Sequence, residues 1–148
     1  MLVRAAKPED AAAFCEVIRS SIVKLCERDY LGGNIKLDEW LKNKTADNCC
    51  AWIEDKASNS FVAEIENEVV GVSHIDHSGH LHLCYVSPNV VGRGVGKMLL
   101  NAAERSVAGL GLSEITLEST VTSKTFYERH GYKFVGKTER CLSYVKAV

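Results

Sequence analysis

The feature that most constrains the fold is a run of alternating glycines, Gly92, Gly94 and Gly96, within the segment SPNVVGRGVGKMLL. The residues before this segment have the pattern of a strand, and those after it repeat apolar side chains every four residues, as a helix does. Glycine lets the backbone approach a ligand closely, but it destabilises the first turn of a helix. The chain must therefore contain a strand that leads through a glycine turn into a helix.

Apolar patterns place strands and helices along the whole chain. The runs SFVAEIE, EVVGVSHID and HLHLCYV are joined by short turn sequences, which predicts an antiparallel three-strand meander. Pro8 followed by two acidic residues predicts the start of a first helix that reaches about Cys26. Further strands are expected at LVRAA, SEITLES, YKFVG and CLSYVKAV, and further helices around Leu37–Leu41, DNCCAWIED and TSKTFYERH. Without linkers or repeats, residues 1–148 are expected to form one mixed α/β domain.

Composition narrows the classes of function. The 18 basic and 19 acidic residues give a formal charge of −1, and no basic block stands out, so we expect no nucleic-acid partner. No apolar run approaches the roughly 18 residues of a membrane-spanning helix. The first residues lack the apolar core of a signal peptide, so we expect a cytoplasmic protein without a membrane partner. The six cysteines lack the spacing of a secreted domain and are expected to be reduced core residues.

The glycine segment is a candidate anion site. The N-terminus of a helix has unpaired N–H groups and a positive dipole end, and Arg93 and Lys97 add charge beside it. The alternative is a glycine turn with a close helix–sheet contact. A Walker A loop is excluded because Gly96-Lys97 is followed by Met98, and the spacing G-x-G-x-x-G of dinucleotide-binding folds is absent.

The segment Val91–Gly96 resembles the pyrophosphate loop Q/R-x-x-G-x-G/A of the GNAT superfamily of N-acetyltransferases. It matches both glycine positions, although Val91 stands where glutamine or arginine is usual. LCYVSPNVVGRGVGKMLL is similar to the strand, loop and helix of that family, and FYERHGY to its FYeklGF signature. The N-terminal half looks like a small bacterial branch of the family.

The resemblance implies a GNAT-type fold, with a mostly antiparallel mixed sheet of about six or seven strands and about four flanking helices. It also implies direct acetyl transfer from acetyl-CoA to a primary amine, which is a small molecule, a protein lysine or an N-terminus. No covalent enzyme intermediate is expected. A non-catalytic CoA-binding or sensing module is the alternative, and a homodimer is possible for this kind of domain.

The resemblance further implies the residues that bind CoA. The pyrophosphate would lie on Arg93 to Lys97, the pantetheine arm would pair with Tyr85 and Val86, and the N–H near Val86 would stabilise the oxyanion. The full expected set is Tyr85, Val86, Val91, Gly92, Arg93, Gly94, Val95, Gly96, Lys97, Thr120, Lys124 and Phe126. Thr120 stands where the family often has an asparagine.

Tyr127 is the candidate proton donor. It occupies the position where family members place a tyrosine near the CoA sulfur. A phenol with a pKa of about 10 can donate a proton or a hydrogen bond to a thiolate leaving group whose pKa is about 8.5. The alternative is a packed aromatic beside Phe126.

His80 is the candidate base, within the cluster His74, His77, His80 and His82. On a regular strand His80, His82 and Cys84 would share one face, and Leu81 and Leu83 the other. The resemblance places His80 where some members carry a catalytic glutamate, but a partly exposed polar strand face explains it equally well. A zinc site at this cluster is disfavoured, because same-face residues on a strand lie nearly 7 Å apart.

The acceptor is not identified by the sequence. The family's acceptor pocket comes from the segment CERDYLGGNIKLDEW and from the end of the chain. Glu27, Asp29 and Asp38 are equally compatible with contact to a cationic amine and with a solvated helix end.

Overall fold

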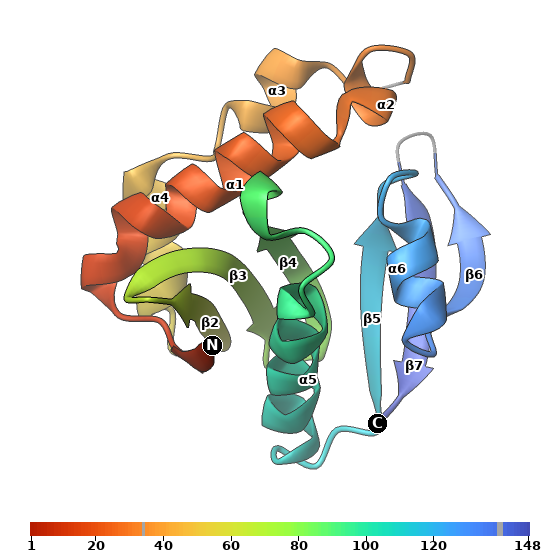
Figure 1. Ribbon diagram of the computed structural model, residues 1–148. Coiled ribbons are helices and arrows are strands. Elements are labelled where there is room, and N and C mark those ends of the chain that lie inside the picture. Colours follow the sequence, from red (N-terminus) through yellow and green to blue (C-terminus); the bar gives the residue numbers. More distant parts are fainter. Residues whose placement is uncertain (34, 139–140) are drawn as a thin grey trace.

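A seven-stranded sheet organises the computed structural model, which describes residues 1–33, 35–138 and 141–148 (Figure 1). The strand order is β1-β2-β3-β4-β5-β7-β6. The strands are β1 (Leu2–Ala5), β2 (Ser58–Ile65), β3 (Glu68–Asp76), β4 (His80–Val86), β5 (Glu114–Ser119), β6 (Lys133–Lys137) and β7 (Leu142–Ala147).

All neighbouring strands are antiparallel except β4 and β5, which are parallel. The predicted meander is β2, β3 and β4, and its first turn is tight because Glu66 and Asn67 both adopt positive φ angles of 53° and 66°. The prediction of a mostly antiparallel mixed sheet is therefore confirmed.

Six α-helices and two 3₁₀ turns accompany the sheet in the described part of the chain. They are η1 (Pro8–Asp10), α1 (Ala11–Leu25), α2 (Glu27–Tyr30), α3 (Leu37–Leu41), α4 (Ala46–Glu54), η2 (Pro88–Val90), α5 (Val95–Ala108) and α6 (Lys124–Arg129). Helix α4 begins at an N-cap, where the Thr45 side chain accepts a hydrogen bond from the Asn48 amide. The short α2 is additional to the sequence prediction, which expected the chain to leave helical structure after α1.

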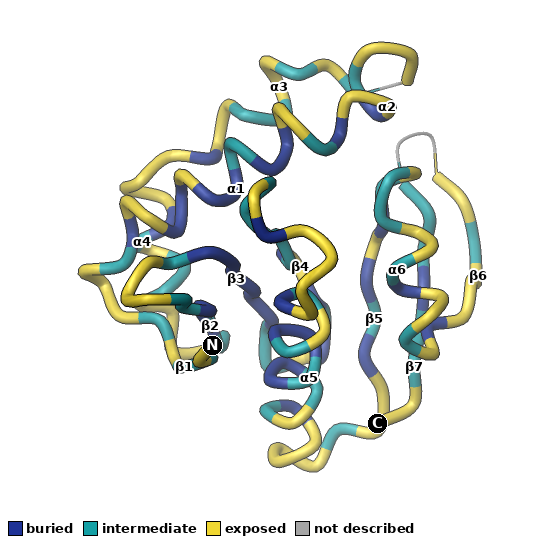
Figure 2. The backbone as a smooth tube through the Cα atoms, in the orientation of Figure 1, coloured by how far each residue is buried: buried dark blue, intermediate teal, exposed yellow. Residues whose placement is uncertain are grey.

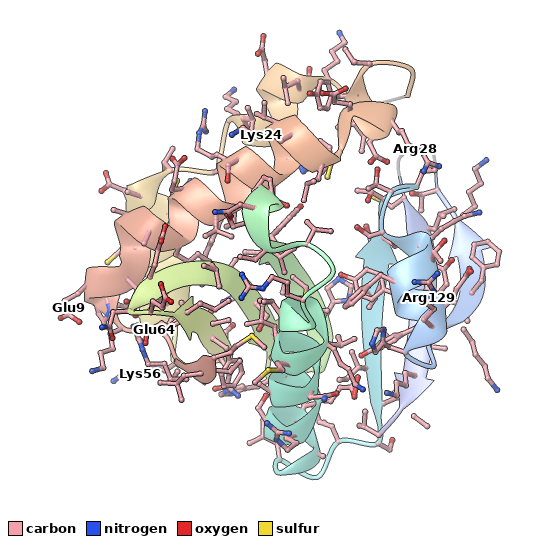
Figure 3. The ribbon with its side chains drawn as sticks, in the orientation of Figure 1. Glu9, Lys24, Arg28, Lys56, Glu64 and Arg129 are labelled. Atoms are coloured by element: carbon pink, nitrogen blue, oxygen red, sulfur yellow. The ribbon has the colours of Figure 1, made fainter. Side chains whose placement is uncertain are left out.

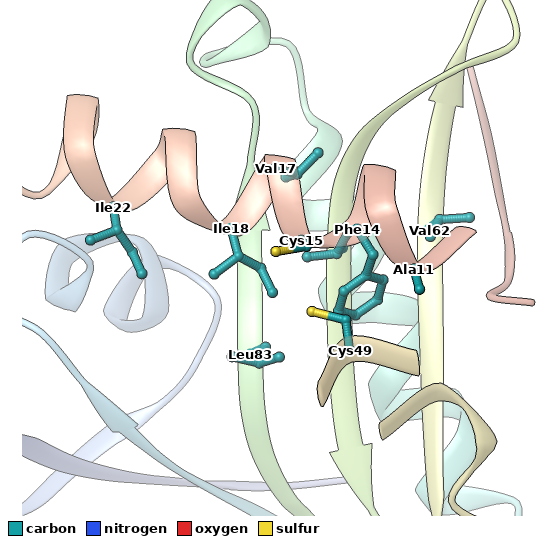
Figure 4. Packing of buried hydrophobic residues seen from close by; sticks show 10 residues of the cluster. Ala11, Phe14, Cys15, Val17, Ile18, Ile22, Cys49, Val62 and Leu83 are labelled. Carbon is teal, nitrogen blue, oxygen red and sulfur yellow. The ribbon is translucent and has the colours of Figure 1, made fainter. Parts of the chain in front are cut away.

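Helices cover both faces of the sheet. On one face α1 and α4 pack on β2, β3 and β4, and the contact includes Phe14, Ile18, Val62 and Leu83 (Figure 4). On the other face α5 and α6 pack on β4, β5 and β7. Figure 2 shows buried segments on the inner sides of α1 and α5 and along β3 and β5. Full burial of each large apolar side chain contributes about 1.5–3 kcal/mol, so the two clusters hold the sheet between two helical layers.

Charged side chains lie mostly on the outside of these layers. Lys24, Arg28 and Arg129 are exposed and project from α1, α2 and α6 (Figure 3). Arg4 of β1 instead bridges Asp10 and Glu64 at 2.8 Å each, which ties the first strand to η1 and β2. Within the described residues, no helix combines the length and apolar character needed to cross a membrane.

Candidate active site

The central strands β4 and β5 are paired over only part of their length. The parallel ladder joins His80 to Thr116 and Leu81 to Leu117, and it ends there although the strands continue to Val86 and Ser119. Figure 1 shows the two strands separating beyond this point. The β4 edge that faces β5 is therefore left unpaired from His82 onward, which makes it available to an extended ligand that carries amide groups.

A β-bulge lies at the point where the strands separate. In the β3–β4 ladder Ile75 pairs with Leu81 and His74 pairs with Leu83, so His82 is an extra residue without a partner. The bulge reverses the alternation of side chains: Leu81 packs in the α5–α6 core, whereas Leu83 packs in the α1–α4 core. The prediction that Leu81 and Leu83 share one face of the strand is therefore wrong, because the two side chains point to opposite faces of the sheet.

His80 and His82 do share a face, as expected, and their ring centroids are 4.8 Å apart. Cys84 does not join them, because it packs in the clusters on the α5 face of the sheet. The bulge explains this as well, because the extra residue His82 shifts the alternation of the side chains that follow it by one position.

The glycine segment forms the N-terminus of α5. Gly92 and Gly94 have φ angles of 82° and 83°, in the left-handed region that favours glycine. Among the described residues, no protein acceptor is found for the backbone N–H groups of Gly94, Val95, Gly96 and Lys97. The Val95 side chain is 1% exposed and packs in the core, so this residue offers only its backbone to a ligand. The helix end is thus a free set of N–H donors with a positive dipole.

A cavity of about 270 Å³, which we call the loop cavity, lies beside this helix end. Predicted cofactor residues Tyr85, Val86, Val91, Gly96 and Phe126 line it. A Cβ atom on Gly96 would lie 3.1 Å from the Phe126 ring, so a larger residue would require this ring to shift by a few tenths of an ångström.

The other predicted cofactor residues lie outside the lining of the loop cavity. Gly92, Arg93, Gly94 and Lys97 are exposed in and after the loop, at its rim. Lys124 is exposed on α6, and Thr120 lines a different cavity. The structure thus brings five of the twelve predicted residues together around the loop cavity, and Gly92, Arg93, Gly94, Val95 and Lys97 are their neighbours in the chain.

A buried carboxylate holds one wall of the loop cavity. Asp29 in α2 is 4% exposed and accepts hydrogen bonds from the Val121 amide, at 2.9 Å, and from the Thr122 hydroxyl. Thr122 lines the cavity, and so does Cys26 just before α2. Asp29 therefore joins α2 to the β5–α6 loop, and its oxygens are not available to a cationic amine as the sequence had allowed.

Tyr127 lies in α6 and is 7% exposed. Its ring packs edge-on against Phe126 and Tyr132, with centroids 5.2 and 5.7 Å away. Burial raises the pKa of its phenol well above the usual value, so the hydroxyl stays protonated at neutral pH. No hydrogen bond of this hydroxyl is found among the described residues, and no fully enclosed polar side-chain atom there lacks a partner, so the hydroxyl oxygen is accessible to a ligand or to water.

Two further cavities adjoin on the α3–α4 side of the sheet. The histidine cavity, of about 330 Å³, is lined by Trp40, His80, His82, Tyr85, Glu118 and Thr120. Glu39 and Cys141 also line it, so it is built from the two regions where the acceptor pocket is expected. The α4 cavity, of about 480 Å³, shares Lys44, His82 and Leu83 with it.

Tyr85 links the two sides, because it lines both the loop cavity and the histidine cavity. Burial raises the pKa of the Tyr85 phenol. The Tyr85 side chain therefore lies between the two cavities.

The histidines differ in their partners. His74 is 6% exposed and its Nδ1 lies 2.6 Å from the Ser60 hydroxyl; burial, and then the proximity of His82, lower its pKa to about 4. His80 contacts the Thr116 hydroxyl through Nδ1 at 2.8 Å, and burial and His82 lower its pKa as well. His82 lies 2.7 Å from Asp76 through Nε2.

The described part of the chain contains no group of three His, Cys, Asp or Glu side chains arranged to hold a metal ion. The histidine ring atoms named above already contact Ser60, Thr116 and Asp76. None of the six cysteines, all of which lie in the described part of the chain, forms a disulfide, and Cys15, Cys26 and Cys49 are buried.

Comparison with known proteins identifies the family. Residues 26–147 match the family model described as an acetyltransferase (GNAT) domain. The chain belongs to the GNAT acetyltransferases. Its predicted membership of this superfamily and its predicted class, N-acetyltransferase, are thereby confirmed.

Individual GNAT proteins resemble the chain over nearly its whole length. The uncharacterized N-acetyltransferase YafP of Escherichia coli K12 is 27% identical over 135 residues, which cover 90% of this chain and 81% of that protein. A GCN5-related N-acetyltransferase from Rhodopseudomonas palustris superimposes with a TM-score of 0.89 at 22% identity, covering 99% and 95% of the two chains. PaiA N-acetyltransferase from Thermoplasma acidophilum, solved in complex with coenzyme A, gives 0.84 at 19% identity over all of both chains. These structures confirm the predicted GNAT fold.

Sequence reasoning missed two parts of this GNAT site. Asp29 looked like a helix-end acid, because its partners Val121 and Thr122 lie more than ninety residues away in the chain. The pair of Asp76 and His82 was also missed, because the bulge that orients His82 has no glycine to mark it.

Proposed function

We propose that the protein transfers an acetyl group from acetyl-CoA directly to a primary amine, while both are bound. The observation that carries this proposal is the separation of β4 and β5 beside the free amides of α5. An anionic group fits the amides of Gly94 to Lys97, and an amide-bearing arm fits the unpaired edge of β4 at Tyr85 and Val86. The coenzyme A bound to the related PaiA structure supports the same donor class.

Acetyl transfer then occurs between the two cavities. The amine nitrogen attacks the thioester carbon, the backbone amides of β4 stabilise the oxyanion, and the C–S bond breaks. The raised pKa of Tyr127 keeps its hydroxyl protonated, so it donates a hydrogen bond to the departing thiolate, while the proton lost from the amine nitrogen passes to water. We assign the amine to the histidine cavity, which Tyr85 connects to the donor side.

We also propose that residues 1–148 act as one acetyltransferase domain. The two large core clusters pack on opposite faces of the same sheet, and α2 is joined to the β5–α6 loop through Asp29. Both cavities draw residues from the first and the second half of the chain.

An acceptor screen tests the proposed reaction. We would follow release of free CoA thiol with a panel of spermidine, tryptamine, kanamycin and a lysine peptide, each with acetyl-CoA. With an active amine, initial rates at varied concentrations of both substrates should give intersecting double-reciprocal lines, as a ternary complex requires. Parallel lines, which indicate a covalent acetyl-enzyme, would contradict the direct mechanism.

A further inference from the structure

The extra residue of the β4 bulge forms a carboxylate–imidazole pair. His82 has no partner in the β3–β4 ladder, and its Nε2 lies 2.7 Å from Oδ2 of Asp76 at the end of β3. The His82 side chain is 47% exposed, and it lines both the histidine cavity and the α4 cavity. Of the two histidines that line the histidine cavity, His82 is the more exposed to solvent, because His80 is half-buried.

Asp76 fixes which nitrogen of His82 carries the proton. Its Oδ1 accepts from the Ser78 amide at 2.9 Å, the Ser78 hydroxyl at 2.5 Å and the His80 amide at 3.2 Å, which leaves Oδ2 for His82. Although burial opposes it, these hydrogen bonds lower the pKa of Asp76, so the carboxylate is charged and can only accept. His82 must then carry its proton on Nε2, and in the neutral ring Nδ1 keeps a free lone pair.

His80 lacks this arrangement. Its Nδ1 contacts the Thr116 hydroxyl, which can donate or accept, so its tautomer is not fixed. Burial and the nearby His82 ring lower the pKa of His80, which disfavours a proton on the His80 ring.

Other titratable groups surround His82 on both sides. Those that line the two cavities with it are Glu39, Lys44, Asp55, His74, Asp76, His80, Tyr85, Glu118 and Cys141. The His82 ring has a hydrogen bond with Asp76. His74 is the other close imidazole, at 5.8 Å between ring centroids.

We propose that His82, oriented by Asp76, is the base that takes the proton from the acceptor ammonium, in place of His80. This inference rests on the proposed function. The N–H bond of the ammonium breaks, its electron pair stays on the amine nitrogen, and the proton binds Nδ1 of His82. The resulting imidazolium is paired with the Asp76 carboxylate and releases the proton to water from its exposed side. Asp76 acts as a positioning residue.

The variant Asp76→Asn isolates the positioning role. Two backbone amides and a hydroxyl point at Oδ1, so the asparagine must keep its oxygen there and turn its NH₂ group toward His82. That NH₂ donates to Nε2 and forces the proton onto Nδ1, which removes the free lone pair while the β3–β4 turn is retained. His77→Gln is the matched control, because His77 lies in the same turn and contacts Asn59, outside both cavities.

Nuclear magnetic resonance on protein with ¹⁵N-labelled histidine tests the pair without any substrate. Long-range ¹H–¹⁵N spectra at mildly alkaline pH should show His82 with its proton on Nε2 in the wild type and in His77→Gln, and on Nδ1 in Asp76→Asn. A wild-type His82 with its proton on Nδ1 would overturn the proposal, whether or not an acetyl acceptor has been found.

Kinetics with the fastest amine of the panel test the role in turnover. We expect His82→Gln and Asp76→Asn each to lower kcat/KM by about 100-fold, with the double variant no worse than His82→Gln. The wild type should lose kcat/KM at low pH, and His82→Gln should not. Imidazole in the buffer should partly restore the activity of His82→Ala. The result that would overturn the proposal is a His82→Gln turnover within twofold of wild type together with a large loss in His80→Gln. His80 would then be the base. If the wild type acetylates no amine, the proposed function fails. The spectra alone then show whether Asp76 holds the His82 proton on Nε2.

Discussion

The two sides of β4 are built in different ways. On the donor side, the candidate anion site consists of backbone amides in one continuous segment, from Gly94 to Lys97. On the acceptor side, the histidine cavity is assembled from side chains of α3, β4, β5 and the C-terminal segment. A site made of local backbone can be recognised in a sequence, whereas a site made of distant side chains depends on strand register and bulges.

The largest expected effect is a loss of kcat on substitution of Tyr127, the side chain by which the donor side takes part in the proposed reaction. Tyr127→Phe keeps the buried ring and removes the free hydroxyl. We expect kcat to fall by about 100-fold, or about 2.7 kcal/mol, while the Kd for acetyl-CoA changes by less than about twofold. Steady-state kinetics and calorimetry measure the two quantities. Equal turnover in both proteins would show that Tyr127 is only a packing residue.

The next effect concerns the wall of the loop cavity. Asp29→Ala leaves the Val121 amide and the Thr122 hydroxyl without their acceptor in a buried place. We expect the free energy of unfolding to drop by about 2 kcal/mol and acetyl-CoA to bind more weakly. Asp29→Asn should lose little of the free energy of unfolding, because the Thr122 hydroxyl can accept a hydrogen bond from the asparagine amide. Asp38→Ala is the control, because Asp38 is exposed. If chemical denaturation shows no difference between Asp29→Ala and Asp38→Ala, the hydrogen bonds of Asp29 do not stabilise the fold.

The smallest effect is a pH dependence on the acceptor side. The pKa of His74 is lowered from 6.5 to about 4, so the folded protein holds it neutral while the unfolded chain binds a proton. Stability should therefore fall as the pH drops from about 6.5 toward 4. The expected loss is about 1–2 kcal/mol, less than the full shift implies because the ring borders the α4 cavity. His74→Gln should flatten this part of the stability curve, and His77→Gln should not. An unchanged slope in His74→Gln would place the titrating group elsewhere.

Most of the fold could be predicted from the sequence. The meander of β2 to β4, the helix after Gly94 and the closing strands follow from local patterns of apolar residues and turns. The resemblance named Tyr85, Val86, Gly96 and Phe126 as CoA-binding residues, and the structure groups them around the loop cavity. These features depend on residues that are close in the chain or that match a known motif.

The acceptor side could not be predicted in the same way. Strict alternation put Leu81 and Leu83 on one face, but the single extra residue His82 separates them. Whether a strand accommodates such a residue depends on the register of its partner β3, which lies outside the local pattern. The pairing of Asp29 with the β5–α6 loop likewise required the folded structure.

Acetyl-CoA binding to Gly94→Glu, measured by calorimetry, tests the central claim most directly. Gly94 and Gly111 have φ angles of 83° and 84°, and a Cβ on either would meet no atom within 4 Å. Glutamate at either position therefore carries a similar backbone strain of about 1–2 kcal/mol, but only at position 94 does a carboxylate enter the anion site. The account predicts tight binding by the wild type and by Gly111→Glu, and binding at least about tenfold weaker in Gly94→Glu. Equal affinity in all three proteins, or none in the wild type, would contradict a donor site on the amides of α5.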